Sequence, residues 1–259
     1  MKKINKTPGP NILTQYFGNN PTGNWNEFRA LNNGVAYNEL RDAIFNDQGG
    51  ICAYCETEVS QLEKHKQRVE HYHSKSDRKN KNWALDWDNV IGVCIGGSDA
   101  NQALHPLPTN LSCDSYKDYL ISKNKLPKAC EGHFINPLRI ITSCCLFSFD
   151  KSTGELIPDI EACKKLDDID NKYTSTIELV RHTIEILNLN CDRLNSQRLE
   201  VLISFNKQFT RAKKANDKEW RNKLTAQWLN NPWKSFFSTR RILLAPHSEY
   251  YLEEISYNG

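Results

Sequence analysis

The sequence predicts a mainly α-helical fold with a small β component, in which a short region rich in Cys and His lies between two helical regions. Residues 51–120 consist of short segments punctuated by Cys, His, Trp, Asn and Gly, without a long helical period. From about Tyr173 onward, apolar residues recur at the spacing of amphipathic helices. Nine cysteines, an odd number, exclude a complete disulfide framework and favour metal binding.

The N-terminal region, residues 1–50, is predicted to be an arm followed by one helix. The first 35 residues are rich in Gly, Pro and Asn, and only Phe28 and Leu31 suggest a helical turn. The apolar positions between Val35 and Phe45 suit a short amphipathic helix that Gly49 and Gly50 end.

The C-terminal region, residues 121–259, is predicted to be mostly helical, with a β-hairpin near 146–157. Alternating apolar residues and a turn closed by Gly154 predict the hairpin. The chain has 259 residues, 39% of them hydrophobic, with a mean hydropathy of −0.65, so disorder is excluded as its main state. Because it lacks a long apolar run and a signal peptide, we expect a cytoplasmic protein without membrane contact.

The net charge of +3 hides an uneven distribution. Residues 193–241 contain twelve Lys and Arg against three acidic residues, a local excess of +9, so the remaining chain carries −6. Such a block is either the solvated face of long helices or a surface that contacts phosphates or an acidic partner.

The Cys52-x-x-Cys55 motif has the spacing of half a tetrahedral zinc site, although a redox pair and two core cysteines are alternatives. We expect Cys94 and Cys113 to complete the site. Spacing alone leaves Cys130 open as the fourth ligand. The remaining thiols lie in apolar or helical surroundings and are interpreted as small buried side chains; they are Cys144, Cys145, Cys163 and Cys191.

A carboxylate lies beside an imidazole at Glu70-His71, between the two halves of the predicted zinc site. This pair offers a hard metal ligand and a base of suitable pKa. On a strand, Glu70 and His71 face opposite sides, and His71 and His73 both point away from Tyr72.

Together, Cys-x-x-Cys, Glu70-His71, Asn89-Val-x-x-x-Cys94 and Cys113-Asp-x-x-Lys resemble the HNH endonucleases, whose ββα-metal core is braced by a structural zinc. The segments around 69–76 and 86–89, and Ile135-Asn-Pro-Leu138, are similar to the PtuB-like HNH subunits of Septu and retron anti-phage systems. The resemblance implies such a core at residues 51–120, between the two helical regions. Where relatives often have a second Cys-x-x-Cys, this chain has Gly97.

The resemblance also implies roles. His71 would be the general base, and Asn89 would hold its imidazole through backbone contacts. Glu70 and Asp114 would bind a catalytic Mg²⁺ or Mn²⁺, while Cys52, Cys55, Cys94 and Cys113 would bind structural Zn²⁺. His73 is either a further metal or phosphate contact or a packing residue.

The implied activity is metal-dependent hydrolysis of phosphodiester bonds in DNA or RNA, as the effector of an anti-phage complex. The implied partners are a PtuA-like ATPase and, in retron systems, a reverse transcriptase with its reverse-transcribed DNA. The alternative function is a non-catalytic zinc module that binds nucleic acid or bridges proteins. The substrate, its sequence specificity, the activating trigger and the stoichiometry are left open.

Overall fold

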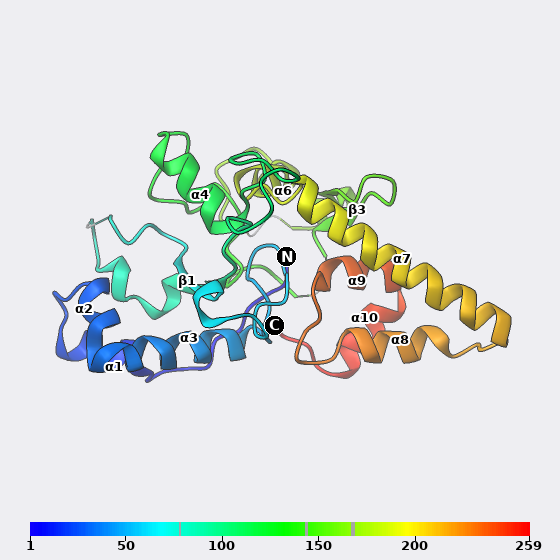
Figure 1. The fold of residues 1–259 in the computed structure, drawn as a ribbon, viewed down its shortest axis with the longest axis horizontal. Coiled ribbons are helices and arrows are strands. Elements are labelled where there is room, and N and C mark those ends of the chain that lie inside the picture. Colours follow the sequence, from blue (N-terminus) through cyan, green and yellow to red (C-terminus); the bar gives the residue numbers. More distant parts are fainter. Residues whose placement is uncertain (78, 143–144, 167–168) are drawn as a thin grey trace.

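The computed structural model describes the whole chain except residues 78, 143–144 and 167–168, so Arg78 and Cys144 lie outside the described residues. No helix in the described part is both long and apolar enough to cross a bilayer. Helices dominate, with two small antiparallel sheets (Figure 1). The α-helices and strands are α1 (Ile12–Asn19), α2 (Trp25–Ala30), α3 (Val35–Asp47), β1 (Arg68–His71), β2 (Val90–Val93), α4 (Cys113–Ser122), β3 (Phe147–Phe149), β4 (Leu156–Pro158), α5 (Ile160–Lys164), α6 (Thr176–Ile186), α7 (Asp192–Ala215), α8 (Trp220–Trp228), α9 (Phe237–Leu244) and α10 (His247–Glu254).

The expectation of an irregular arm over the first 35 residues is wrong beyond residue 11, because α1 and α2 form there. Each helix begins with a reciprocal capping box, which satisfies backbone N–H groups that would otherwise lack partners. Asn11 pairs with Thr14 in α1, and Asn24 pairs with Glu27 in α2. Residues 1–10 form the only extended arm in this region, and the backbone N–H of Ile4 donates to the carbonyl of Pro137 at 2.9 Å.

The central sheet pairs β1 with β2 in antiparallel register, so that Glu70 lies opposite Ile91 and His71 opposite Val90. Helix α3 packs on this hairpin. The side chain of Gln48, just after α3, donates to the carbonyl of Gly92 at 2.8 Å and accepts from its N–H at 2.6 Å. A Cβ at Gly92 would lie 2.9 Å from the Phe45 ring, so glycine permits this close approach.

The C-terminal region contains the predicted β-hairpin, with Phe149 paired to Leu156. Its buried apolar residues are continuous with those around the cysteine-rich segment, so one core joins the two regions. A second core, which includes Leu13, Phe28 and Leu40, joins α1, α2 and α3 to the segment that precedes β2. The C-terminal part of α7 and the loop that follows it project at the end of the molecule opposite α1–α3, and α8 returns beside α9 and α10 (Figure 1).

Candidate metal centre and active site

Four cysteine thiols converge in the buried centre of the structure. The Sγ atoms of Cys52, Cys55, Cys94 and Cys113 lie within 4.8 Å of one another. The separations are 3.8 Å for Cys52–Cys113, 3.7 Å for Cys55–Cys94 and 3.8 Å for Cys94–Cys113. Zn–S bonds of about 2.3 Å in a regular tetrahedron require about 3.8 Å between sulfurs, so this donor set fits a structural zinc.

The chemistry of the thiols also fits a cation. Burial raises the pKa of Cys52 and Cys113, whereas hydrogen bonds from Cys113 and the other thiols lower the pKa of Cys55. Four thiolates in this space would repel one another strongly without a positive ion. Metal binding therefore has to accompany loss of the remaining protons.

Tight backbone turns bring the four cysteines together. The carbonyl of Cys52 accepts a hydrogen bond from the N–H of Glu56 at 3.0 Å, which closes the Cys52-x-x-Cys55 turn. Gly96 has φ +62°, and a Cβ there would lie 2.2 Å from the carbonyl of Ser112. Glycine is therefore required where the chain after Cys94 passes the start of α4, which carries Cys113.

The other described cysteines lie outside this cluster. The Cys130 thiol donates to the carbonyl of Pro127 at 3.4 Å, so the structure brings Cys113, and not Cys130, to the other three sulfurs. Cys163 and Cys191 are buried and Cys145 is partly buried.

His71 ends β1 as a buried, neutral imidazole. Its Nε2 lies 3.1 Å from the carbonyl oxygen of Ala84, and the Trp25 ring meets it edge-on at 4.5 Å. Burial lowers the pKa of His71 to about 3, so the ring is neutral at physiological pH. A neutral ring that faces a carbonyl through Nε2 carries its proton there, and Nδ1 is then the basic atom.

Asn89 holds the backbone that follows His71. Its Oδ1 accepts from the N–H of His73 at 2.7 Å, and its Nδ2 donates to the carbonyls of His73 and Trp83, both at 2.9 Å. These bonds join the end of β1 to the segment that supplies Ala84. The amide contacts backbone groups of the neighbouring residues and reaches His71 only through them.

His73 belongs to a separate network. Nδ1 lies 2.7 Å from Glu131 and Nε2 lies 3.0 Å from Asp77, while the ring stacks on Trp83 at 3.8 Å. Both ring nitrogens are thus engaged away from Glu70 and Asp114. The structure therefore does not bring the His73 ring to Glu70 or Asp114, and His73 contacts Asn89 through its backbone.

Glu70 and Asp114 line one cavity of about 440 Å³, which we call the carboxylate cavity. Asp114 is 8% exposed, and its Oδ1 is buried and has no hydrogen-bond partner among the described residues. Burial raises the pKa of Asp114 to about 6, and the charges of Arg68 and Lys75 oppose this shift. An unpartnered buried carboxylate oxygen is suited to a hard divalent cation. The cations lining the cavity are Arg29, Arg41, Lys64, Arg68 and Lys75.

Several residues at the site were not predicted from the sequence, among them Asp118 on α4, a third carboxylate that lines the carboxylate cavity. Lys117, one turn after Asp114 on α4, is buried, forms an ion pair with Glu70 and donates to the carbonyl of His71 at 2.8 Å. Trp25 lines the carboxylate cavity and contacts His71, which does not itself line it. The Lys of Cys113-Asp-x-x-Lys was the available signal for Lys117, whereas nothing near Trp25 indicated its position.

Comparison with known proteins tests the resemblance over the whole chain. No family model matches. Over 248 residues, 94% of each chain, this sequence is 40% identical to an Escherichia coli protein named "Retron Ec83 putative HNH endonuclease". A relationship of this extent confirms the predicted resemblance to the HNH endonucleases in a retron context. The chain is a nuclease and belongs to the HNH endonuclease family.

Proposed function

We propose that this chain is a metal-dependent HNH nuclease that hydrolyses nucleic-acid phosphodiester bonds with His71 as general base. One observation carries the proposal: a neutral His71 faces Ala84 through Nε2, and Glu70, its neighbour on β1, shares a cation-lined cavity with Asp114. The β1–β2 hairpin and α4 would form the ββα-metal core within residues 51–120, flanked by regions 1–50 and 121–259.

In this mechanism the Nε2–H of His71 donates to the carbonyl of Ala84, which fixes the tautomer. Nδ1 accepts a proton from water as the water oxygen bonds to phosphorus, and the bond from phosphorus to the leaving oxygen breaks. The low pKa of His71 leaves the ring unprotonated at physiological pH, so the lone pair of Nδ1 is free, and the same shift makes it a weaker base than an exposed imidazole. Because His71 is 3% exposed and its ring packs against Trp25, this mechanism requires a local opening that admits water to Nδ1.

Glu70 and Asp114 would hold Mg²⁺ or Mn²⁺, whose positive charge would stabilise the scissile phosphate and the leaving oxygen. Lys117 positions Glu70 and ties α4 to the end of β1. Asn89 positions His71 by holding the backbone that follows it. Cys52, Cys55, Cys94 and Cys113 would hold Zn²⁺ as a brace, since the cluster is closed and buried.

The name of the E. coli relative supports a role in a retron system. We propose that the chain is a PtuB-like effector in anti-phage defence of the Septu or retron type and acts in the cytoplasm. Its partners would be a PtuA-like ATPase and a reverse transcriptase with its reverse-transcribed DNA. Copurification from cells that express the complete operon tests this assignment, and recovery of the chain without any of these partners would contradict it.

Divalent-ion dependence tests the nuclease proposal. The chain, together with whatever copurifies with it, is incubated with plasmid DNA and total RNA over a series of Mg²⁺ and Mn²⁺ concentrations. We expect cleavage only with a divalent ion, and a loss of at least about 100-fold in Glu70→Gln. The matched control is Glu161→Gln, an exposed carboxylate on α5. Equal cleavage by wild type and Glu70→Gln would contradict the proposal and favour the non-catalytic zinc module.

A further inference from the structure

The basic block of residues 193–241 separates into a buried part and an exposed part. Four of its cations are built into the body. Arg193 donates to Ser112 Oγ at 2.9 Å, Arg198 is fully buried, and Arg241 pairs with Glu249 at 2.6 Å. The fourth, Arg240, lies over the Trp228 ring at 4.3 Å. Lys234 is exposed after α8. The remaining seven are all exposed on α7, α8 and the loop between them: Lys207, Arg211, Lys213, Lys214, Lys218, Arg221 and Lys223.

These seven cations lie on one projecting helical hairpin, residues 205–228, which we call the basic arm (Figure 1). Aromatic side chains hold its two helices together. The Trp220 ring on α8 lies 5.6 Å from Phe205 and 5.7 Å from Phe209, both on α7. The cations are therefore presented on a fixed scaffold.

Most of this charge is not neutralised within the molecule. The arm contains two acids, Asp217 and Glu219, and only Asp217 forms an ion pair, with Lys223 at 2.9 Å. The other six cations of the arm have no ion pair among the residues that the structure describes. Lys207, Arg211 and Lys214 follow helical spacing, so they form one stripe about 10 Å long on α7.

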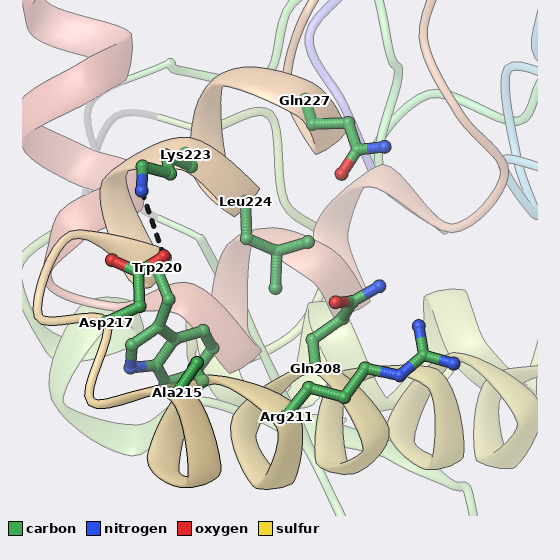
Figure 2. Close-up of a pocket in the computed structure, with 9 residues that line it drawn as sticks. Gln208, Arg211, Ala215, Asp217, Trp220, Lys223, Leu224 and Gln227 are labelled. Carbon is green, nitrogen blue, oxygen red and sulfur yellow. Dashed lines mark hydrogen bonds and ion pairs between the residues drawn. The ribbon is translucent and has the colours of Figure 1, made fainter.

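A groove between α7 and α8 runs beside this stripe (Figure 2). It has a volume of about 250 Å³, and Arg211 contributes to its α7 side. Gln208 and Gln227 bring amide groups to it from the two helices, Leu224 points into it, and the Trp220 ring stands at the end nearest the loop (Figure 2). Amide and guanidinium groups can bind phosphate and sugar oxygens without reading base sequence.

We propose that the basic arm binds the sugar-phosphate backbone of a nucleic acid at a position separate from the carboxylate cavity. The proposal rests on the proposed function in one way: the nucleic acid that is cleaved at the carboxylate cavity would also be held by the basic arm. Nucleic acid fits this surface better than an acidic protein because protein interfaces have cores depleted in charge. Protein–DNA interfaces are instead polar and strongly positive. The surface of the arm is of this kind, because Phe209 is its only exposed large apolar side chain.

Equilibrium binding over a salt series tests the proposal. The probes are fluorescein-labelled duplex DNA, single-stranded DNA and RNA of one mixed sequence, measured by anisotropy with the full chain and without added Mg²⁺ or Mn²⁺. The test variant combines Lys207→Gln, Arg211→Gln and Lys214→Gln. The control combines Lys125→Gln, Lys151→Gln and Lys164→Gln, three exposed lysines outside the arm.

We expect the arm variant to bind at least one probe at least about tenfold more weakly than the control. A plot of log affinity against log salt concentration has a negative slope. We expect this slope to become shallower by about 1 for each phosphate contact that the variant loses. Equal affinities and slopes for the arm variant and the control would overturn the proposal. Labelled polyglutamate serves as a probe for an acidic protein. If the arm variant loses binding to polyglutamate and keeps its binding to all three nucleic acids, the proposal is also overturned. This experiment measures binding and not cleavage. Its result therefore tests the basic arm even if the catalytic assignment of His71 is wrong.

Discussion

The cysteine cluster and the carboxylate cavity meet in the sequence at Cys113 and Asp114, yet they differ in donor chemistry and in the space around their donor atoms. In the cluster, each sulfur has another sulfur as its neighbour and the four thiols are buried. In the cavity, Asp114 keeps a carboxylate oxygen without a partner beside an open space. Closed sites of this kind hold structural metals, and open sites leave positions for substrate and water.

Helix α4 connects the two sites, because its first residue, Cys113, belongs to the cluster and its second, Asp114, lines the cavity. Lys117 then fastens the same helix to β1. The arrangement implies an asymmetric dependence: loss of the cluster should disturb the cavity, whereas changes in the cavity should leave the cluster intact. The following predictions test that asymmetry.

The largest effect is expected from Cys113→Ser. Loss of one ligand should reduce zinc from about one ion per chain and should lower the Tm or abolish the cooperative unfolding transition, because structural zinc contributes folding energy directly. Elemental analysis and thermal unfolding measure both. Cys130→Ser, a buried cysteine outside the cluster, is the control and should retain zinc. A folded Cys113→Ser protein with full zinc would contradict the structural role.

Asp114→Asn should separate the two sites. We expect zinc content to be unchanged, cleavage to fall about 10–100-fold, and the Mg²⁺ or Mn²⁺ concentration for half-maximal cleavage to rise, because a neutral amide binds these ions poorly. Cleavage rates over a divalent-ion titration measure this. Asp150→Asn, in the exposed hairpin turn, is the matched control. An unchanged divalent requirement would remove Asp114 from the cation site.

Lys117→Met should have a smaller effect on cleavage and a clear effect on stability. Removing the ammonium group leaves the buried Glu70 carboxylate without its ion-pair partner, which lowers the free energy of unfolding. Chemical denaturation should therefore show that Glu70→Gln in the Lys117→Met background restores part of the lost stability. The double variant should cleave as poorly as Glu70→Gln alone. If Glu70→Gln costs the same stability with and without Lys117, the two side chains are not coupled.

The smallest expected effect is a pH dependence of stability without divalent ions. The pKa of Asp114 is raised to about 6, so the folded state binds its proton more tightly than the unfolded state. This carboxyl therefore lowers stability progressively as pH rises from about 4 to about 6, and fully above that. The Tm of Asp114→Asn should exceed that of wild type by a few degrees at pH 7.5 and match it near pH 3.5. An equal Tm difference at both pH values would exclude this titration.

The closeness of Cys52 and Cys55 could be predicted from the sequence because their spacing is local, whereas the choice of Cys113 over Cys130 as the fourth cysteine of the cluster needed the fold. The helices at residues 12–30 were missed because composition outweighed two capping boxes at Asn11 and Asn24. The pairing of Lys117 with Glu70 depends on how α4 approaches β1, which no local pattern encodes. The basic block looked uniform in sequence, yet burial of Arg198 and pairing of Arg241 remove them from its surface.

The most direct test of the central claim is to measure cleavage and zinc content on the same preparation of His71→Ala. We expect zinc equal to wild type, an unfolding transition unchanged within a few degrees, and cleavage at least about 100-fold slower. His182→Ala, a half-exposed histidine on α6, is the control and should cut like wild type. Wild-type cleavage by a folded, zinc-loaded His71→Ala protein would contradict the assignment of the general base.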